Sequence, residues 1–259
     1  MVDPGLRRDD GVEVIRADAF GDIPHGFLGR RGGVSTGVVA GLNVGLGTGD
    51  EADAIQSNRR RAAHAVLQGA RLATVYQVHS ADCVTVSEPW PDAQRPHADA
   101  LVTATPGLLL GIVTADCAPV LFVDRTAGVI GAAHAGWKGA VGGVTDATIA
   151  AMEALGATRA NIVAVIGPCI AQVSYEVDAG FKARFPAEAA RFFAEGKPGH
   201  FQFDLPGHVA ARLHAARLGS VEVLGLDTYA DADRFFSFRR ATHRAEPDYG
   251  RQFSLIGLP

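Results

Sequence analysis

Two histidines and one cysteine in this sequence could together hold a soft metal ion. His79 and Cys117 each follow an apolar segment, and His134 ends a third apolar segment. Two imidazoles and a thiolate form a three-ligand set for zinc or copper. Three protein ligands leave one coordination position open, which distinguishes a catalytic zinc site from a closed structural one. The three residues therefore indicate a catalytic metal centre.

The spacing of these residues is a weak signal by itself. They are 38 and 17 residues apart, much wider than the ligand spacing of a zinc finger. Taken singly, His79 suits an ordinary loop histidine, and Cys117 suits a buried cysteine, since a free cysteine behaves as a small hydrophobic residue. All three, however, lie at the carboxyl end of a predicted strand. Neighbouring strands could bring these ends together, so we predict that the three side chains meet.

Several polar residues near the predicted ligands have two interpretations each. Asp116 could orient a ligand histidine or move a proton, or it could accept hydrogen bonds from loop amides. Asp99, near the start of a predicted strand, has the same alternatives. Asn43 and Gln77 could hydrogen-bond to a base edge or a ribose hydroxyl, whereas Asn43 could equally stabilise a turn.

Two cationic side chains are candidates for binding phosphate. Lys138 lies in the segment Gly136–Gly139, which opens a predicted helix, and amides at a helix start suit an anion. The segment lacks the Walker pattern, and Lys138 could equally be solvated. Arg239 ends a predicted strand, and its guanidinium could bind phosphate oxygens in pairs.

The pattern of apolar residues predicts an α+β protein with layered mixed sheets flanked by helices. Glycine-rich residues 25–49 are typical of turns with close backbone approach. Strands and helices are mixed without strict alternation, which favours this class over a Rossmann fold. The predicted helices are 50–68, 139–155, 178–185 and 206–218. The predicted strands are 74–78, 84–87, 100–104, 109–114, 120–124, 129–134, 162–166, 221–224, 235–239 and 253–256.

Composition restricts the class of protein further. The chain has 259 residues, a formal net charge of −4 and three cysteines. A net negative charge disfavours a nucleic-acid-binding protein, and sparse cysteines suit a reducing compartment. No apolar stretch approaches the roughly 20 residues that span a bilayer. We expect a soluble cytoplasmic protein with a peripheral N-terminal segment, 1–24, and a single catalytic domain, 25–259. Nothing in the sequence indicates its oligomeric state.

Several motifs occur in order along the chain and carry a family resemblance. They are Gln77–His79, Ala98–Thr103, Thr114–Val120, Ala133–Gly139, Gly167–Ile170, Tyr175–Val177 and Phe235–Arg240. From about residue 25 onwards the chain resembles the YfiH-like laccase-domain family, whose members carry the names polyphenol oxidase and purine nucleoside phosphorylase.

The resemblance implies a fold, a metal site and an activity. The implied fold is an α/β/β/α-type sandwich, and the implied ligands of one zinc ion are His79, Cys117 and His134. The implied reaction converts adenosine, inosine or guanosine and phosphate to the free base and ribose 1-phosphate. Deamination of adenosine is a second implied activity. In this interpretation Asp116 steers a proton, and Arg239 or Lys138 holds phosphate.

Three other functions stay open at this point. A His₂Cys set also binds copper, which would suit a polyphenol oxidase, although the nine histidines include no His-x-His pair. Without a metal, Cys117 could act as the nucleophile of a hydrolase that processes a cell-wall peptide precursor. A metal-binding protein without enzymatic activity is the third alternative. The zinc nucleobase deaminase signature, His-x-Glu with Pro-Cys-x-x-Cys, is absent from the sequence.

Overall fold

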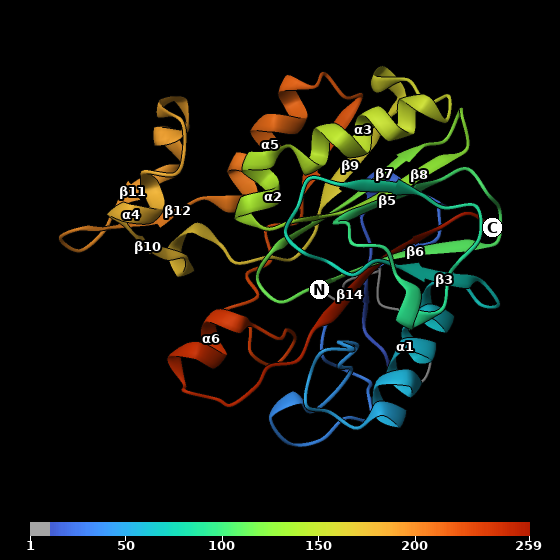
Figure 1. Cartoon of the computed structure of the whole chain (residues 1–259), viewed down its shortest axis with the longest axis horizontal. Helices are drawn as coiled ribbons and strands as arrows, with labels where there is room; N and C mark the ends of the chain where they lie inside the picture. Colours follow the sequence, from blue (N-terminus) through green and yellow to red (C-terminus); the bar gives the residue numbers. More distant parts are fainter. Residues whose placement is uncertain (1–10) are drawn as a thin grey trace.

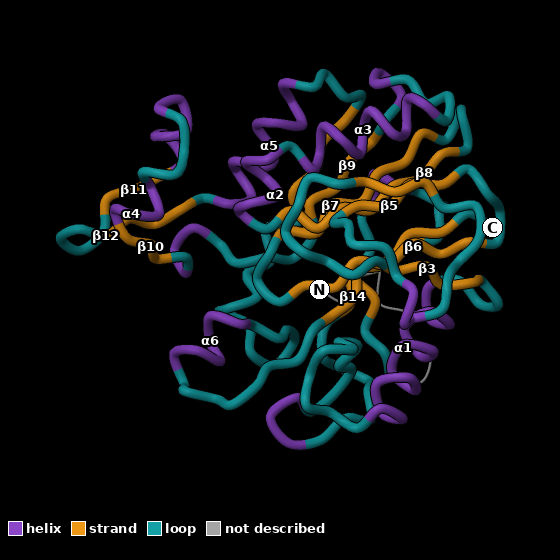
Figure 2. Tube along the Cα trace, in the orientation of Figure 1, coloured by secondary structure: helices purple, strands orange, loops and turns teal. Residues whose placement is uncertain are grey.

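The protein consists of two large β-sheets packed face to face, with helices on the outer face of each. The structure is a computed structural model that describes residues 11–259. Helix α1 covers one sheet, and helices α2, α3 and α5 cover the other (Figure 1). Figure 2 shows the strands gathered in the middle of the molecule between these helices. The α+β class and the α/β/β/α layering predicted from the sequence are confirmed.

Each sheet combines strands from distant parts of the sequence. Within residues 11–259, the first sheet has the order β1-β2-β14-β6-β3, and the second has the order β13-β9-β7-β8-β5-β4. The strands of the first sheet are Val14–Ile15, His25–Leu28, Gln252–Gly257, Leu108–Thr114 and Arg71–Thr74. Those of the second are Ser220–Val223, Val163–Ile166, Ala118–Asp124, Val129–Ala135, Ala100–Thr103 and Cys83–Thr85.

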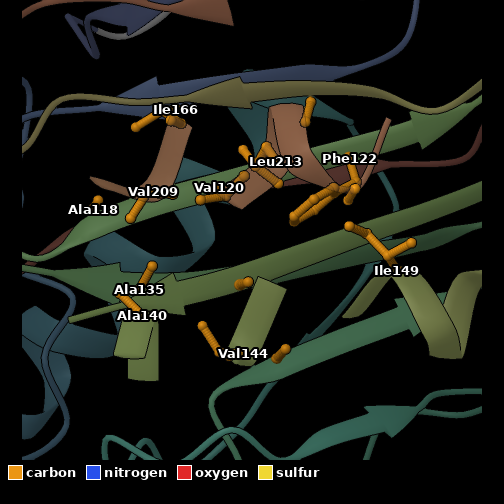
Figure 3. Close-up of a cluster of buried hydrophobic side chains, with 14 of the residues drawn as sticks. Ala118, Val120, Phe122, Ala135, Ala140, Val144, Ile149, Ile166, Val209 and Leu213 are labelled. Carbon is orange, nitrogen blue, oxygen red and sulfur yellow. The ribbon is translucent and has the colours of Figure 1, made fainter. Parts of the chain in front are cut away.

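Three apolar layers explain why the central strands are apolar along their whole length. Side chains of β7 alternate between two of these layers, because successive residues of a strand point to opposite faces. Val120 and Phe122 pack under the outer helices, as Figure 3 shows, whereas Leu121 and Val123 pack between the two sheets. A strand covered on both faces is buried throughout, and every residue of β7 and β8 is buried.

Local capping signals set several helix boundaries. Asp204 accepts a hydrogen bond from the amide of Gly207 at the start of α5, with Pro206 in the first turn. The Asp178 side chain, at the start of the predicted helix 178–185, caps α4 in the same way. The helices are α1 Ala52–Val66, α2 Trp137–Gly142, α3 Val144–Ala154, α4 Ala179–Lys182, α5 Leu205–Ala215 and α6 Phe238–His243.

A small third sheet projects from one end of the layered body (Figure 1). It has the order β10-β12-β11, with strands Glu176–Asp178, His200–Phe203 and Phe193–Glu195. None of these three strands is predicted from the sequence. Its aromatic side chains pack on one another, as in the Phe193–Phe203 pair with ring centroids 4.7 Å apart.

Four local predictions are wrong. The predicted helix 139–155 is two helices, because Gly143 adopts a left-handed φ of 96° between them. The predicted strand 235–239 is instead a loop that leads into α6, since the Ser237 hydroxyl accepts a hydrogen bond from the Arg240 amide and starts a helix. The predicted strand 74–78 is displaced to β3, which ends at Thr74. Residues 25–49 are not all turns, since they begin with the buried strand β2.

Part of the segment 1–24, which the sequence analysis sets apart, lies within the described residues. There β1 pairs with β2, and Phe20 is fully buried between the sheets. The boundary at residue 25 stays a prediction. No helix within residues 11–259 is long and apolar enough to cross a membrane.

Candidate metal centre

His79, Cys117 and His134 come together at one end of the two sheets. His134 lies near the end of β8, Cys117 lies immediately before β7, and His79 lies in the loop that follows β3. One ligand atom from each residue lies within 4.8 Å of the others. The Cys117 Sγ is 4.0 Å from the His79 Nε2 atom, and the two imidazole centroids are 4.8 Å apart. The prediction that these three side chains meet agrees with this geometry.

A single buried carboxylate, that of Asp99, positions both histidines. Its Oδ1 atom lies 2.7 Å from Nδ1 of His134, which leaves Nε2 of that ring for a ligand. Its Oδ2 atom accepts hydrogen bonds from the amides of Val78 and Ser80, on either side of His79. Of the alternatives for Asp99, this geometry supports a hydrogen-bond acceptor that orients His134 and the backbone around His79.

The backbone around the ligands adopts conformations that most residues avoid. His79 has φ of 61° and Asp116 has φ of 83°, both in the left-handed region. Such strained positions cluster at functional sites, where the surrounding structure holds them in place.

Gly136 leaves open the space that the three ligands face. A Cβ atom at this position would lie 2.9 Å from the Cys117 Sγ and 2.9 Å from the His79 Cδ2. Both distances are shorter than side-chain carbons normally allow, so a larger residue would displace the ligands. Glycine is therefore required here by space, because its φ of −66° is open to any residue.

The environment of Cys117 favours its thiolate. Burial alone would raise the pKa of this thiol, but the charges and hydrogen bonds of His134 and His79 outweigh it and lower the pKa to about 7. Cys83 and Cys169 differ, since burial raises the pKa of Cys83 to about 12 and raises that of Cys169 still further. Cys117 is thus the one of the three cysteines suited to bind a metal or to act as a nucleophile.

The donor set fits zinc. Tetrahedral coordination with Zn–N near 2.0–2.1 Å and Zn–S near 2.3 Å requires ligand atoms roughly 3.3–3.6 Å apart. The ligand atoms here lie within 4.8 Å of one another, so small side-chain rotations would close them onto an ion. His134 is already oriented by Asp99, as the histidine ligands of catalytic zinc usually are.

Asp116 lies beside Cys117 but does not contact the histidines. Its carboxylate accepts hydrogen bonds from the Thr228 hydroxyl, the Ser237 hydroxyl and the Arg239 amide. Burial raises its pKa, and these three donors oppose that effect. Of the alternatives for Asp116, the structure thus shows the acceptor role, in which it ties the start of α6 to the loop that carries Cys117.

Two cavities meet at the ligand cluster. The larger, of about 310 Å³, is lined by all three ligands and by polar side chains that include Gln77, and we call it the polar cavity. The smaller, of about 190 Å³, is lined by His79 and Cys117 together with Trp137, Tyr175, Phe238 and Arg239, and we call it the aromatic cavity. Known small-molecule sites occupy roughly 300–1,000 Å³, so the two cavities together suit a small substrate that spans the ligands.

Of the other predicted site residues, two line a cavity at this centre and two do not. Gln77 lines the polar cavity, with its amide held by the backbone of Val113. Arg239 lines the aromatic cavity. Asn43 is fully buried and hydrogen-bonds to the Thr48 hydroxyl and the Gly45 amide in its own loop and to the distant Arg251 amide. Lys138 is exposed, with its Nζ 5.7 Å from the centroid of the Trp137 ring, and it lines neither cavity.

Sequence reasoning misses two arginines in the polar cavity, Arg95 and Arg251. Arg95 lies in the loop before β5, and Arg251 immediately precedes β14. Neither belongs to a recognisable motif. Only the tertiary structure brings them into the cavity that Cys117 also lines.

The fold and site define a layered α+β protein with a single three-residue candidate metal site among residues 11–259. The chain belongs to the family described as multi-copper polyphenol oxidoreductase laccase, which matches residues 24–259. A purine nucleoside phosphorylase of Deinococcus radiodurans is 40% identical over 252 residues, covering 96% of this chain and 94% of that protein. A purine nucleoside phosphorylase of Pseudomonas aeruginosa is 35% identical over 233 residues, covering 88% and 90%.

Solved structures share the whole fold. The protein YfiH of Bacillus licheniformis superposes with a TM-score of 0.87 at 28% identity, covering 99% of this chain and 100% of that one. A Neisseria meningitidis protein of the DUF152 family superposes with a TM-score of 0.85 at 34% identity, covering 96% and 99%. The family resemblance expected from the motifs is therefore confirmed.

Proposed function

We propose that this protein is a zinc-dependent purine nucleoside phosphorylase. The observation that carries the proposal is the convergence of His79, Cys117 and His134 in the polar cavity, at the place where His79 and Cys117 also line the aromatic cavity. Relatives that cover most of the chain at 35% and 40% identity bear the name purine nucleoside phosphorylase, which supports the choice of substrate.

The proposed reaction exchanges one bond of the nucleoside for another. The bond between C1′ of ribose and the purine nitrogen breaks, and a bond from C1′ to a phosphate oxygen forms. The leaving nitrogen takes a proton. The products are the free base and ribose 1-phosphate, so the site must bind a flat heteroaromatic base, a sugar and a phosphate anion around one reacting carbon.

The two cavities divide these tasks in a way that suits the substrate. The Trp137, Tyr175 and Phe238 side chains of the aromatic cavity offer surfaces for a purine ring, and Arg239 lies among them as a hydrogen-bond donor. Gln77 in the polar cavity is fixed by two hydrogen bonds to Val113 and offers amide atoms to a ribose hydroxyl. The reacting carbon would then lie beside Cys117.

The candidate ligands can hold zinc without a large rearrangement. A zinc ion at this position supplies a Lewis acid and lowers the pKa of a bound water. Asp99 keeps His134 in the orientation needed for binding, and Gly136 keeps the space clear. We assign proton steering to Asp116, which lines the aromatic cavity beside Cys117 and whose pKa is raised by burial. Deamination of adenosine, which needs an activated water, is a second proposed activity of the same site.

The copper oxidase alternative has less support from the site. Chemistry that uses several coppers would need several ligand groups, and His79, Cys117 and His134 are the one such group found in the described part of the chain. The cysteine hydrolase alternative rests on the lowered pKa of Cys117, and the experiment below distinguishes it from the zinc enzyme.

The test combines metal content with product analysis. We expect protein purified without added metal to contain about one zinc per chain and to convert inosine and phosphate to hypoxanthine and ribose 1-phosphate. The Cys117→Ala variant should lose both zinc and activity. The Cys83→Ala variant is the control, because Cys83 lies outside the site and its thiol pKa is raised to about 12.

Other outcomes would contradict the proposal in different ways. A zinc-free wild-type protein that is inactivated by alkylation of Cys117 would indicate the cysteine hydrolase. Copper with dioxygen consumption would indicate the oxidase. Bound zinc with neither phosphorolysis nor deamination would reject the nucleoside as the substrate.

A further inference from the structure

Two arginines share the polar cavity with the candidate metal ligands. Arg95 and Arg251 come from segments separated by most of the sequence, yet both line the cavity of about 310 Å³ that also contains His79 and Cys117. No carboxylate is found among the described residues that line this cavity. A ligand in it would therefore meet two permanent positive charges and no carboxylate.

Both guanidinium groups are held by uncharged partners. Arg95 donates to the backbone oxygens of Asp92 and Val75, and Arg251 donates to the hydroxyl of Tyr249. Each guanidinium also lies over an aromatic ring, with the Arg251 group 4.8 Å from the centroid of Tyr249. These contacts fix the two side chains while leaving their charges without an ion-pair partner among residues 11–259. A half-buried guanidinium that is held in place but has no ion-pair partner is suited to bind an anion.

The backbone near Arg251 is built to hold it in place. The Asn43 Oδ1 atom accepts hydrogen bonds from the amides of both Arg251 and Gly45, which ties the glycine-rich loop to the start of β14. A Cβ atom at Gly45 would lie 3.0 Å from the Arg251 Nη1 atom. Because Gly45 has no side chain, the Arg251 guanidinium can lie against the glycine-rich loop. Buried Asn43 influences the cavity indirectly, since it holds the backbone of Arg251.

We infer that Arg95 and Arg251 form the phosphate subsite of the polar cavity. The inference rests on the proposed phosphorolysis and deepens it, since it names the side chains that bind the second substrate. The geometry favours this pair over the two cations that the sequence suggested. Lys138 is exposed outside the cavity, and the Arg239 Nη1 atom donates to the backbone oxygen of Glu176 from the aromatic cavity.

The experiment compares charge-removing variants by two readouts. The variants are Arg95→Gln and Arg251→Gln, with Arg60→Gln on the exposed face of α1 as the matched control. The first readout is the KM for inorganic phosphate and the KM for inosine in initial-rate assays. The second is the shift in thermal midpoint that inorganic phosphate causes without nucleoside. Zinc content is measured for every variant.

We expect the KM for phosphate to rise at least about tenfold in each cavity variant, because a charge-assisted hydrogen bond is lost. The KM for inosine should stay within about twofold of wild type, and the phosphate-induced thermal shift should shrink or vanish. Arg60→Gln should match wild type in all readouts.

Several results would overturn the subsite. An unchanged KM for phosphate in both variants would do so while leaving the phosphorolysis intact. A rise in this KM in Arg239→Gln or Lys138→Gln instead would reassign the phosphate, and loss of zinc in the cavity variants would make their effect indirect. If wild type forms no ribose 1-phosphate, the phosphorolysis fails, and the thermal shift alone decides whether the two arginines bind phosphate.

Discussion

Replacing Gly136 by alanine should remove the metal without unfolding the protein. The new Cβ atom would lie 2.9 Å from both the Cys117 Sγ and the His79 Cδ2, whereas ordinary contact begins at 3.4 Å. At least one of these two side chains must therefore shift by roughly half an ångström, and the added methyl group leaves less room for the rotations that bring the ligands onto an ion. We expect zinc affinity to fall at least about tenfold, which corresponds to about 1.4 kcal/mol.

The rest of the chain should tolerate this substitution. The φ of −66° and ψ of 163° at Gly136 are open to alanine, so no backbone strain is added. Gly136 precedes the first turn of α2, where alanine is a poorer cap than glycine, and the resulting loss of stability should be about 1 kcal/mol or less. A change of this size leaves a domain of this length folded.

Gly142→Ala is the matched control for this prediction. A Cβ atom at Gly142 would meet only the Cβ of Ala81, at 3.7 Å, and Gly142 lies within α2. Alanine in a helix should keep the protein at least as stable as wild type and leave zinc binding unchanged.

Zinc affinity would be measured by competition with a chromophoric chelator, and folding by circular dichroism. If Gly136→Ala binds zinc as tightly as wild type and Gly142→Ala do, the three residues are not the metal site in this geometry. Loss of zinc in the control variant as well would mean that α2 itself, and not the space beside Cys117, controls binding.

Three further predictions follow from the same structure. Asp99→Asn should lower zinc affinity by about 10- to 100-fold, because an amide cannot accept every hydrogen bond that the carboxylate accepts; unchanged affinity would refute its positioning role. Chelation should expose Cys117 to iodoacetamide while Cys83 stays unreactive, and mass spectrometry of both forms would show whether zinc protects that thiol. Burial lowers the pKa of His208 to about 4, below the value of about 6.5 that it has in the unfolded chain. Between these two pH values the unfolded chain binds a proton that the folded protein does not bind, so the free energy of unfolding should fall as the pH drops. In urea titrations between these pH values, the free energy of unfolding of His208→Leu should fall by up to about 3 kcal/mol less than that of wild type. An equal fall in both proteins would exclude this histidine as the cause.

The layered fold could be largely predicted from local patterns. The apolar run of β7 is continuous because one set of its residues, such as Phe122, packs under helices while the other, such as Leu121, packs between sheets. The start of α5 follows from the Asp204 cap and Pro206, which act through neighbouring backbone atoms only. Such signals depend on residues close in sequence, so they are readable without the fold. The motif resemblance added the ligand set that spacing alone left open.

The segment 235–239 shows where local patterns fail. Its aromatic residues resemble a strand, yet the Ser237 hydroxyl accepts a hydrogen bond from the Arg240 amide, and distant Asp116 accepts one from the Arg239 amide. These bonds favour a helix at this position. The Asp116 contact joins residues more than a hundred positions apart, so no window of sequence contains it.

The sequence by itself determined the layered α+β class and the positions of α1, α5 and most strands, and the resemblance added the two-sheet layering and the three metal-binding candidates. Only the tertiary structure decided what surrounds them. Arg95 and Arg251 reach the polar cavity because the loop before β5 and the start of β14 both border it, and Gly136 must be small because a Cβ atom there would meet Cys117 and His79. These are distances between segments far apart in the chain, and such distances exist only once the sheets have packed against each other.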